Sequence, residues 1–361
     1  MTNCTTLRAR WFHAKATIPG LDGLRAVSIA LVLLGHLSGT QGFPLSLRRI
    51  PLGVFGVRIF FVISGFLITS ILLRELREAG EISLDRFYFR RILRLFPASY
   101  FLIAVMGFLG SRRVIQLAPW DLSFGVTYTM NYYDGRGWPL GHLWSLAVEE
   151  QFYLLWPFAL KAMGPRRATR VLLGVLAAAP LLRLVSPHVG PALNFAVWSD
   201  ALGTGCLLAL LRRCLAGNAR YSSMLRSRWF ALIPAIAFLA GLVPSTKLQF
   251  LFCGTIMNVA IAITIDWAIS AAGGPVARFL NCTPVTFVGL LSYSLYLWQQ
   301  PFLNRSSAAV WCSFPLNLLL AAVAALGSFL LIESPFLRMR ESLERAAFEP
   351  ARVRAAVTRT A

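Results

Sequence analysis

The chain has 361 residues, of which 57% are hydrophobic and 14% charged, and its 35 Lys and Arg against 15 Asp and Glu give a formal charge of +20. A mean hydropathy of +0.64 is far higher than an ordinary soluble domain needs, which indicates an integral membrane protein. The positive charge does not indicate nucleic-acid binding, because the basic residues are dispersed between apolar segments and form no arginine-rich, aromatic-interleaved motif.

Apolar runs of about membrane-spanning length recur along the chain. They predict an all-α, polytopic membrane protein: a single membrane domain over residues 1–361, with about ten transmembrane helices between 24 and 333 and short tails at both ends. The ten runs cover residues 24–40, 53–73, 92–110, 143–161, 171–186, 193–211, 229–243, 248–270, 285–303 and 314–333.

The distribution of basic residues predicts the orientation. With ten spans, the two tails and the even-numbered loops share one side of the membrane and hold 25 Lys and Arg, whereas the odd-numbered loops hold 8, if Arg183 belongs to the fifth loop. Because cytoplasmic loops are enriched in Lys and Arg, both termini are expected in the cytoplasm.

The first run, "LRAVSIALVLLGH", contains Arg25 and His36. On a helix these residues are about 16 Å apart along the axis and within roughly 20° of the same face. Both are costly in lipid, so a shared functional face is one interpretation. The alternative is an arginine that snorkels to the interface and a histidine that bonds a neighbouring helix.

The second and third runs add small and basic residues. Ser64 and Gly65 in mid-span predict close helix packing or a break in the helix. Arg91 and Arg94 share a helix face at the start of the third run, on the same side of the membrane as Arg25. Paired guanidinium groups suit phosphate binding, although topology signalling and contact with lipid headgroups would also explain them.

The fourth run, "HLWSLAVEEQFYLLWP", places Glu149 and Glu150 about two turns inward from His142. A carboxylate at that depth needs a partner or a water-filled cavity. His142, Trp144 and Tyr153 could instead form only an interfacial belt. Other polar residues within or near the ends of the later runs are Asp200, Asn258, Asp266, Gln299, Gln300 and Glu333. Of these, we interpret Asp200, Asn258 and Asp266 as packing or cavity-lining residues.

The cysteines predict no metal site, because they form no CxxC pair and no cluster with metal-ligand spacing. We interpret them as small apolar fillers. They are Cys4, Cys206, Cys214, Cys253, Cys282 and Cys312.

Six segments together resemble the family 3 membrane acyltransferases, which are bacterial multi-span proteins that O-acylate saccharides and related acceptors. The segments run in family order: "GLDGLRA" followed by His36, "FFVISGFLI", "RRILRLFP", "HLWSLAVEEQFYLLWP", "SYSLYLW" and "IESPF".

The resemblance implies an acyl-coenzyme A donor, usually acetyl, on the cytoplasmic side of the inner membrane. The implied acceptor is a saccharide or glycolipid hydroxyl nearer the outer side, as in lipopolysaccharide or another polysaccharide. Arg25, Arg91 and Arg94 match the positions expected to bind coenzyme A, and His36 and Glu149 match those expected in catalysis. Glu150 matches a position that varies more, and the residues expected to support the site are Ser64, His142, Trp144, Tyr153, Gln299 and Glu333.

Histidine's unperturbed pKa of about 6.5 suits His36 to general-base work, and Glu149 is expected to orient its ring or to stabilise its imidazolium form. An acyl-histidine intermediate is the alternative mechanism. A transporter or flippase for a lipid-linked or saccharide substrate is the alternative function, since it would use a similar polar cavity.

Two positions depart from the family pattern. Many relatives have a histidine where this chain has Gln299, so either that residue is not needed or glutamine keeps its hydrogen bond without proton transfer. Many relatives also have an acidic residue where Arg58 stands. A more basic outer vestibule is therefore expected.

Overall fold

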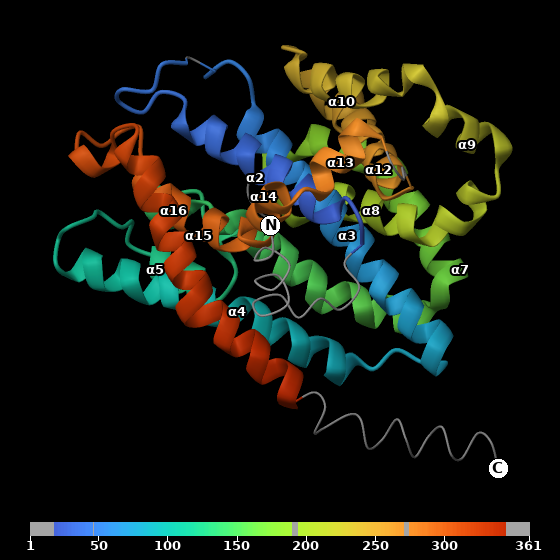
Figure 1. Ribbon diagram of the computed structural model, residues 1–361, viewed down its shortest axis with the longest axis horizontal. Coiled ribbons are helices and arrows are strands. Elements are labelled where there is room, and N and C mark those ends of the chain that lie inside the picture. The colour runs from blue at the N-terminus through green and yellow to red at the C-terminus, as the bar shows by residue number, and fades with distance from the viewer. Residues whose placement is uncertain (1–17, 46, 190–193, 271–273, 344–361) are drawn as a thin grey trace, which may run out of the picture.

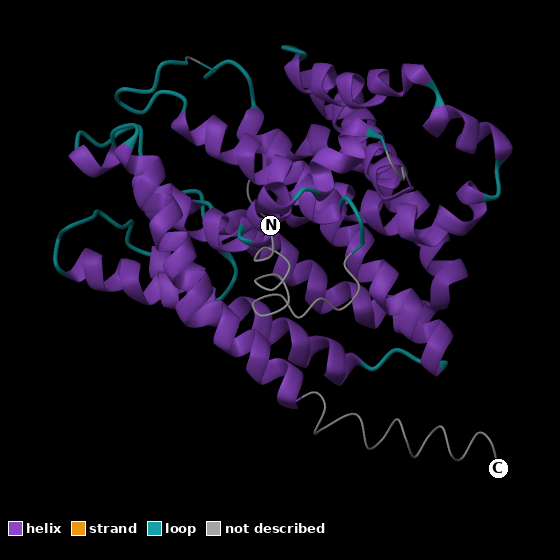
Figure 2. Cartoon of the chain, in the orientation of Figure 1, coloured by secondary structure: helices purple, strands orange, loops and turns teal. Residues whose placement is uncertain are grey.

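The computed structural model describes residues 18–45, 47–189, 194–270 and 274–343. All regular structure in these residues is helical (Figure 2), as the sequence predicts. The longer helices are α2 (Leu21–Leu37), α3 (Leu52–Ala79), α4 (Leu84–Ser111), α7 (Leu143–Val189), α8 (Asn194–Ala216), α10 (Leu232–Leu242), α12 (Gly254–Ser270), α15 (Ser292–Phe302) and α16 (Leu316–Ser328). The shorter elements are α5 (Asp121–Val126), η1 (Met130–Tyr132), α6 (Trp138–Gly141), α9 (Ala219–Arg226), η3 (Arg228–Ala231), α11 (Thr246–Leu248), η4 (Gln249–Cys253), α13 (Pro275–Asn281), α14 (Thr283–Leu290), η5 (Val310–Cys312) and η6 (Phe329–Glu333).

Five helices among the described residues are long and apolar enough to cross a membrane, and a sixth candidate is a pair of helices bent by 74°. The remaining predicted spans fall on shorter or interrupted helices: α2 has 17 residues, and α14 is separated from α15 at Leu291. The five are Leu52–Ala79, Leu84–Ser111, Phe195–Ala216, Leu251–Ser270 and Leu316–Leu343, and the bent pair is Ala219–Arg226 with Arg228–Leu242.

Gly164 divides α7 into two helical segments. Its φ of 71° and ψ of 165° lie in a region that glycine alone adopts readily. Pro165 follows and begins the next helical segment. This break separates the predicted runs 143–161 and 171–186.

Close backbone contacts hold the central helices together. A Cβ at Gly65 would collide with the carbonyl of Leu202 on α8, and one at Gly205 would collide with the carbonyl of Val62 on α3. The predicted close packing at Gly65 is therefore confirmed, and it brings α3 against α8 near the middle of the molecule (Figure 1).

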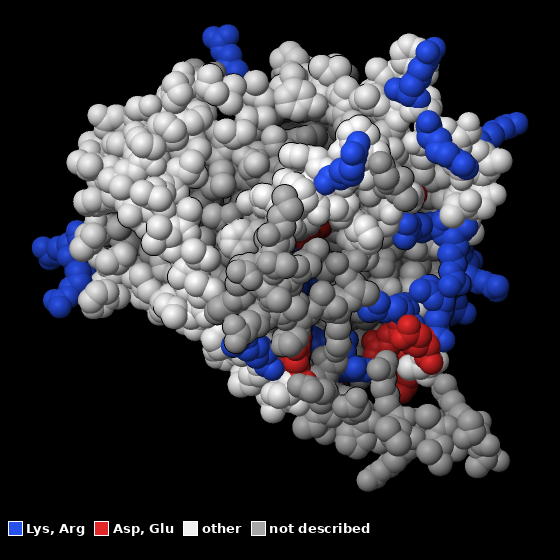
Figure 3. All heavy atoms as spheres, viewed as in Figure 1, with Lys and Arg blue, Asp and Glu red and all other residues white. Residues whose placement is uncertain are grey.

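The surface suits a lipid environment. In the view of Figure 3 a wide area is free of charge, and most Lys and Arg gather along the right and lower right edge. Large apolar side chains face outward on α16 and η6, where Leu319 is 59% and Leu331 76% exposed. Such faces are stable in contact with lipid.

Candidate active site

The predicted cationic residues gather where α2 begins. Arg94 on α4 interacts electrostatically with Arg25 on α2, with its neighbour Arg91 and with Arg340. Arg91 and Arg25 also act on Glu149 of α7. The fold therefore brings Arg25, Arg91, Arg94 and Glu149 into one group, which we call the arginine cluster.

Glu149 is held by a network of hydrogen bonds and ring contacts. The Ser64 hydroxyl on α3 donates to Glu149 Oε1 at 2.7 Å, and the Tyr153 hydroxyl donates to Ser64 Oγ at 3.2 Å. Arg91 lies over the Tyr153 ring, with 4.5 Å between its guanidinium carbon and the ring centroid. Glu149 and Tyr153 are four residues apart and so share a face of α7. The contacts of these two side chains with Ser64 and Arg91 link α7 to α3 and α4.

Three more carboxylates border the arginine cluster. Asp22 pairs with Arg25 at 3.2 Å. Glu150 interacts with Arg91 and Glu149, and its Oε1 is buried without a hydrogen-bond partner among the described residues. Glu333 accepts a hydrogen bond from Ser294 and interacts with Arg94. The cluster thus combines fixed cations with carboxylates that balance part of their charge.

His36 lies at the other end of α2, and Gln299 on α15 fixes its ring. His36 Nδ1 donates to Gln299 Oε1 at 2.7 Å, which leaves Nε2 as the nitrogen with a free lone pair. Gly53 of α3 lies beside this nitrogen, and a Cβ added there would be 3.9 Å from Nε2, at van der Waals contact. The amide nitrogen of Gln299, Nε2, is buried without a hydrogen-bond partner among the described residues.

Two residues that the sequence reasoning missed complete the surroundings of His36. The Trp138 ring meets His36 edge to face at 5.5 Å, and Arg305 lies over Trp138 at 5.3 Å and acts electrostatically on His36. Trp138 stands four residues before His142, and a tryptophan so close to a motif histidine could have marked it. Arg305 and Arg340 carry no comparable signal in the sequence.

His142 packs inside the bundle, so the belt interpretation is wrong for it, whereas Trp144 is half-buried and packs against another helix. His142 is 3% exposed, and its Nε2 donates to the Leu297 carbonyl at 3.0 Å. Trp144 packs against Trp198 with 4.8 Å between ring centroids. The two side chains therefore contact α15 and α8.

The expected contact between Glu149 and His36 is corrected by the structure. The partner of His36 Nδ1 is Gln299, whereas Glu149 accepts from Ser64. Glu149 interacts with Arg25 near the start of α2, whereas His36 lies near the end of that helix. The two residues are therefore at opposite ends of α2.

The basic outer vestibule is also corrected, because the charge of Arg58 is balanced inside the bundle. Arg58 borders a cavity of about 240 Å³, but its Nη1 donates to Asn258 at 3.0 Å and lies 3.9 Å from the Asp200 carboxylate. Arg183, which the topology assigned to a loop, is 1% exposed and pairs with Asp200 at 3.2 Å. Asp200 and Asn258 are packing residues, as the sequence analysis interpreted them.

The described residues contain no group of three or more His, Cys, Asp or Glu side chains placed to hold a metal ion. Five cysteines within them are free thiols, and Cys4 lies outside the described residues.

The comparison with known proteins decides the family. The family model described as "Acyltransferase domain" matches residues 18–333. The chain belongs to the family 3 membrane acyltransferases. This match confirms the resemblance seen in the six motifs and, with the apolar helices, makes the chain a membrane protein.

Curated relatives of the chain are named as O-acetyltransferases. O-acetyltransferase OatA of Staphylococcus aureus (strain NCTC 8325) is 30% identical over 95% of this chain and 60% of the relative. Peptidoglycan O-acetyltransferase OatA of Listeria monocytogenes is 28% identical over 93% of the chain and 57% of the relative. Putative peptidoglycan O-acetyltransferase YrhL of Bacillus subtilis is 30% identical over 88% and 54%. The chain thus spans little more than half the length of these relatives, and no solved structure matches it.

Proposed function

We propose that the chain is an integral membrane O-acyltransferase. It moves an acyl group, most simply acetyl, from coenzyme A on the cytoplasmic side to a hydroxyl of a saccharide or glycolipid on the outer side. Family membership and relatives named as O-acetyltransferases support this proposal. In it, the chain is one domain in the bacterial cytoplasmic membrane, with about ten spans and both termini in the cytoplasm.

The arginine cluster is the proposed dock for the phosphates of coenzyme A. Arg25 and Arg91 both act electrostatically on Arg94, and a bound phosphate would compensate the positive charge that Asp22 and Glu149 balance only in part. Guanidinium groups suit phosphate esters because each can donate two parallel hydrogen bonds. The slim pantetheine arm would then extend along α2 toward His36.

His36 is the proposed general base. Its Nε2 takes the proton from the acceptor hydroxyl while that oxygen attacks the thioester carbonyl. When the tetrahedral intermediate collapses, the carbon–sulfur bond breaks, and the proton on Nε2 passes to the coenzyme A sulfur. The ester, the free thiol and a neutral His36 result.

Gln299 serves both His36 and the reacting carbonyl in this proposal. Its Oε1 holds His36 Nδ1–H, and its buried Nε2 has no hydrogen-bond partner among the described residues. A buried amide donor beside the base is suited to stabilise the oxyanion that develops on the thioester carbonyl. Glutamine in place of histidine at position 299 would then supply a different hydrogen-bond donor to the oxyanion at the same place in the site.

The acceptor is proposed to be a saccharide of the cell envelope. The Listeria relative is named as a peptidoglycan O-acetyltransferase, so peptidoglycan is the first acceptor to test for this chain. The arrangement of His36, Trp138 and Gln299 supports a sugar acceptor, because aromatic faces and amide groups are suited to bind sugar rings and hydroxyls.

The hydrogen bond between His36 and Gln299 carries the proposal, since it holds the proton on Nδ1 and leaves Nε2 with a free lone pair. The test is acyl transfer by the purified chain in proteoliposomes, with radiolabelled acetyl-CoA and peptidoglycan fragments or lipid-linked saccharides as acceptors. We expect labelled ester in the saccharide fraction and release of free coenzyme A. Movement of the saccharide across the bilayer without consumption of acetyl-CoA would instead establish a transporter.

A further inference from the structure

A basic cavity, separate from the arginine cluster, lies beside α2 at the same end of the bundle as Arg25. Its volume is about 1330 Å³, and Leu24 and Val27 of α2 form part of its wall. None of the residues of the arginine cluster lines it. Five arginines do: Arg77, Arg212, Arg213, Arg226 and Arg228. The cavity is thus a distinct concentration of positive charge.

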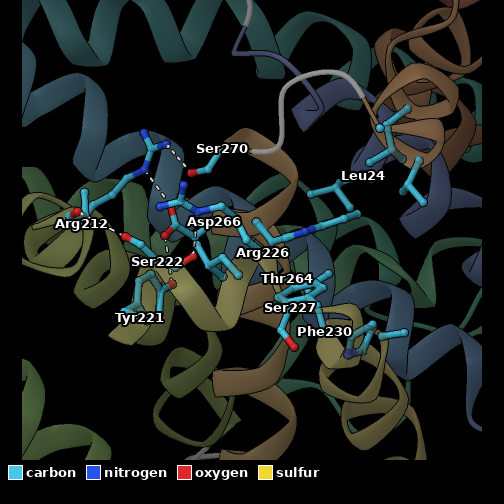
Figure 4. A pocket seen from close by; sticks show the side chains of 18 of the residues that line it. Leu24, Arg212, Tyr221, Ser222, Arg226, Ser227, Phe230, Thr264, Asp266 and Ser270 are labelled. Carbon is cyan, nitrogen blue, oxygen red and sulfur yellow. Dashed lines mark hydrogen bonds and ion pairs between the residues drawn. The ribbon is translucent and has the colours of Figure 1, made fainter. Parts of the chain in front are cut away.

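One carboxylate anchors one side of this cavity. Asp266 is 3% exposed, and it accepts hydrogen bonds from Arg212 Nε at 2.7 Å and from the Tyr221 hydroxyl at 2.9 Å. Figure 4 shows these three side chains close together, away from Leu24. Asp266 forms an ion pair with Arg212. Its negative charge therefore does not balance the other arginines of the cavity.

The other four arginines of the cavity lack a carboxylate partner among the described residues. Within the described residues, Arg77, Arg213, Arg226 and Arg228 form no ion pair with a carboxylate, and all four are exposed. Arg226 Nε bonds only the Ser222 carbonyl of its own helix at 3.3 Å. Four uncompensated cations around one cavity indicate an anionic ligand.

The rest of the wall is apolar and continues onto the outer surface. Leu73, Phe230, Trp267 and Leu280 line the cavity together with the more exposed Val276 and Phe279. On α10 the apolar surface extends away from the cavity through Leu232, Ile236 and Leu239, which are 54%, 45% and 60% exposed. A ligand with an anionic head and apolar chains can therefore occupy the cavity and lie along α10.

The location of the cavity separates two sources of phosphate. It lies where α3, α8 and α12 end and where α9, rich in polar residues, meets the apolar α10 at the 74° bend. Basic pockets between transmembrane helices at headgroup depth bind anionic phospholipids. A lipid enters such a pocket sideways along an apolar surface, whereas coenzyme A would approach from the aqueous phase.

We propose that this cavity is a binding site for an anionic phospholipid, separate from the site at which the acyl donor binds. The arginines hold the phosphodiester head, and the acyl chains lie against α13 and α10. The bound lipid would fix the bent helix pair α9 and α10 against α2, the helix that carries Arg25 and His36.

Lipid binding to the purified full-length chain tests this proposal by native mass spectrometry in detergent. The probes are phosphatidylglycerol and, as the neutral comparison, phosphatidylcholine. The cavity variant is Arg213→Gln with Arg226→Gln. The control variant is Arg74→Gln with Arg220→Gln, which removes the same charge from exposed arginines outside the cavity.

We expect the wild type and the control variant to retain phosphatidylglycerol over phosphatidylcholine, and the cavity variant to bind phosphatidylglycerol about tenfold more weakly or worse. Equal loss in both variants would overturn the proposal, because binding would then report only total charge. A loss of acetyl-CoA binding in the cavity variant, with phosphatidylglycerol binding unchanged, would also overturn it and assign the cavity to the donor. These readouts do not depend on acyl transfer, so they stand apart from a failure of the proposed enzymatic function.

Discussion

At the scale of single residues, the oxygen and the nitrogen of the Gln299 amide have different surroundings. Its Oε1 accepts from His36 Nδ1 at 2.7 Å, whereas its Nε2 is buried without a hydrogen-bond partner among the described residues. In the proposed reaction the oxygen selects the histidine tautomer and the nitrogen meets the oxyanion. The two roles can be separated by substitution.

Replacement of Gln299 by leucine should lower kcat about hundredfold, because one oxyanion donor alone is worth about that much. Gln299→Glu keeps an acceptor for His36 Nδ1 but removes the amide donor, so kcat should also fall. The KM for acetyl-CoA should change little in either variant. Steady-state kinetics in proteoliposomes provide the measurement, and full activity of both variants would exclude a direct role for Gln299.

The arginine cluster predicts a defect in donor binding. Arg94→Ala should raise the KM for acetyl-CoA about tenfold or more, since hydrogen bonds to charged groups contribute about 1.5–3 kcal/mol. Arg74→Ala is the matched control, because Arg74 is exposed and on the proposed cytoplasmic side. An Arg94→Ala variant with an unchanged KM would contradict the proposed dock.

Helical spacing was enough to predict that Arg25 and His36 lie on one helix, and it placed Arg91 beside Arg94. It could not predict that Gln299 bonds His36 and that Glu149 does not, since contacts between helices depend on packing in three dimensions. Arg58 was misread for the same reason: its partners Asp200 and Asn258 lie on other helices.

At the scale of elements, small residues set the distance between α3 and α8. Gly65→Ala should destabilise the protein by roughly 1–3 kcal/mol, because the added methyl group meets the α8 backbone and cannot be accommodated without movement. Gly327→Ala on α16 is the control, since nothing lies within 4 Å of its added Cβ. Thermal unfolding in detergent measures both, and equal melting temperatures would show that the contact is not limiting.

The sequence predicted helices better than it predicted spans. Apolar runs locate most helical segments, but polar residues and breaks leave α2 and α15 short of the length that a simple span requires. Packing against neighbours can stabilise such segments in a membrane.

At the scale of the whole molecule, the proposed topology has an even number of spans and cytoplasmic termini. A fluorescent protein fused to residue 361 should fluoresce, and a periplasmic phosphatase fused there should be inactive. The same phosphatase inserted in the loop at residues 112–113 should be active, because this loop is expected outside. The opposite pattern would reverse the orientation and place the arginine cluster on the wrong side for coenzyme A.

The proposed acyl transfer depends on His36. The most direct test compares acetyl transfer from acetyl-CoA by the wild type and by His36→Ala in proteoliposomes, with acetyl-CoA binding measured on the same preparations. If His36 is the general base, the variant inserts and binds acetyl-CoA as the wild type does but transfers no acetyl group. Transfer by His36→Ala at the wild-type rate would contradict this role.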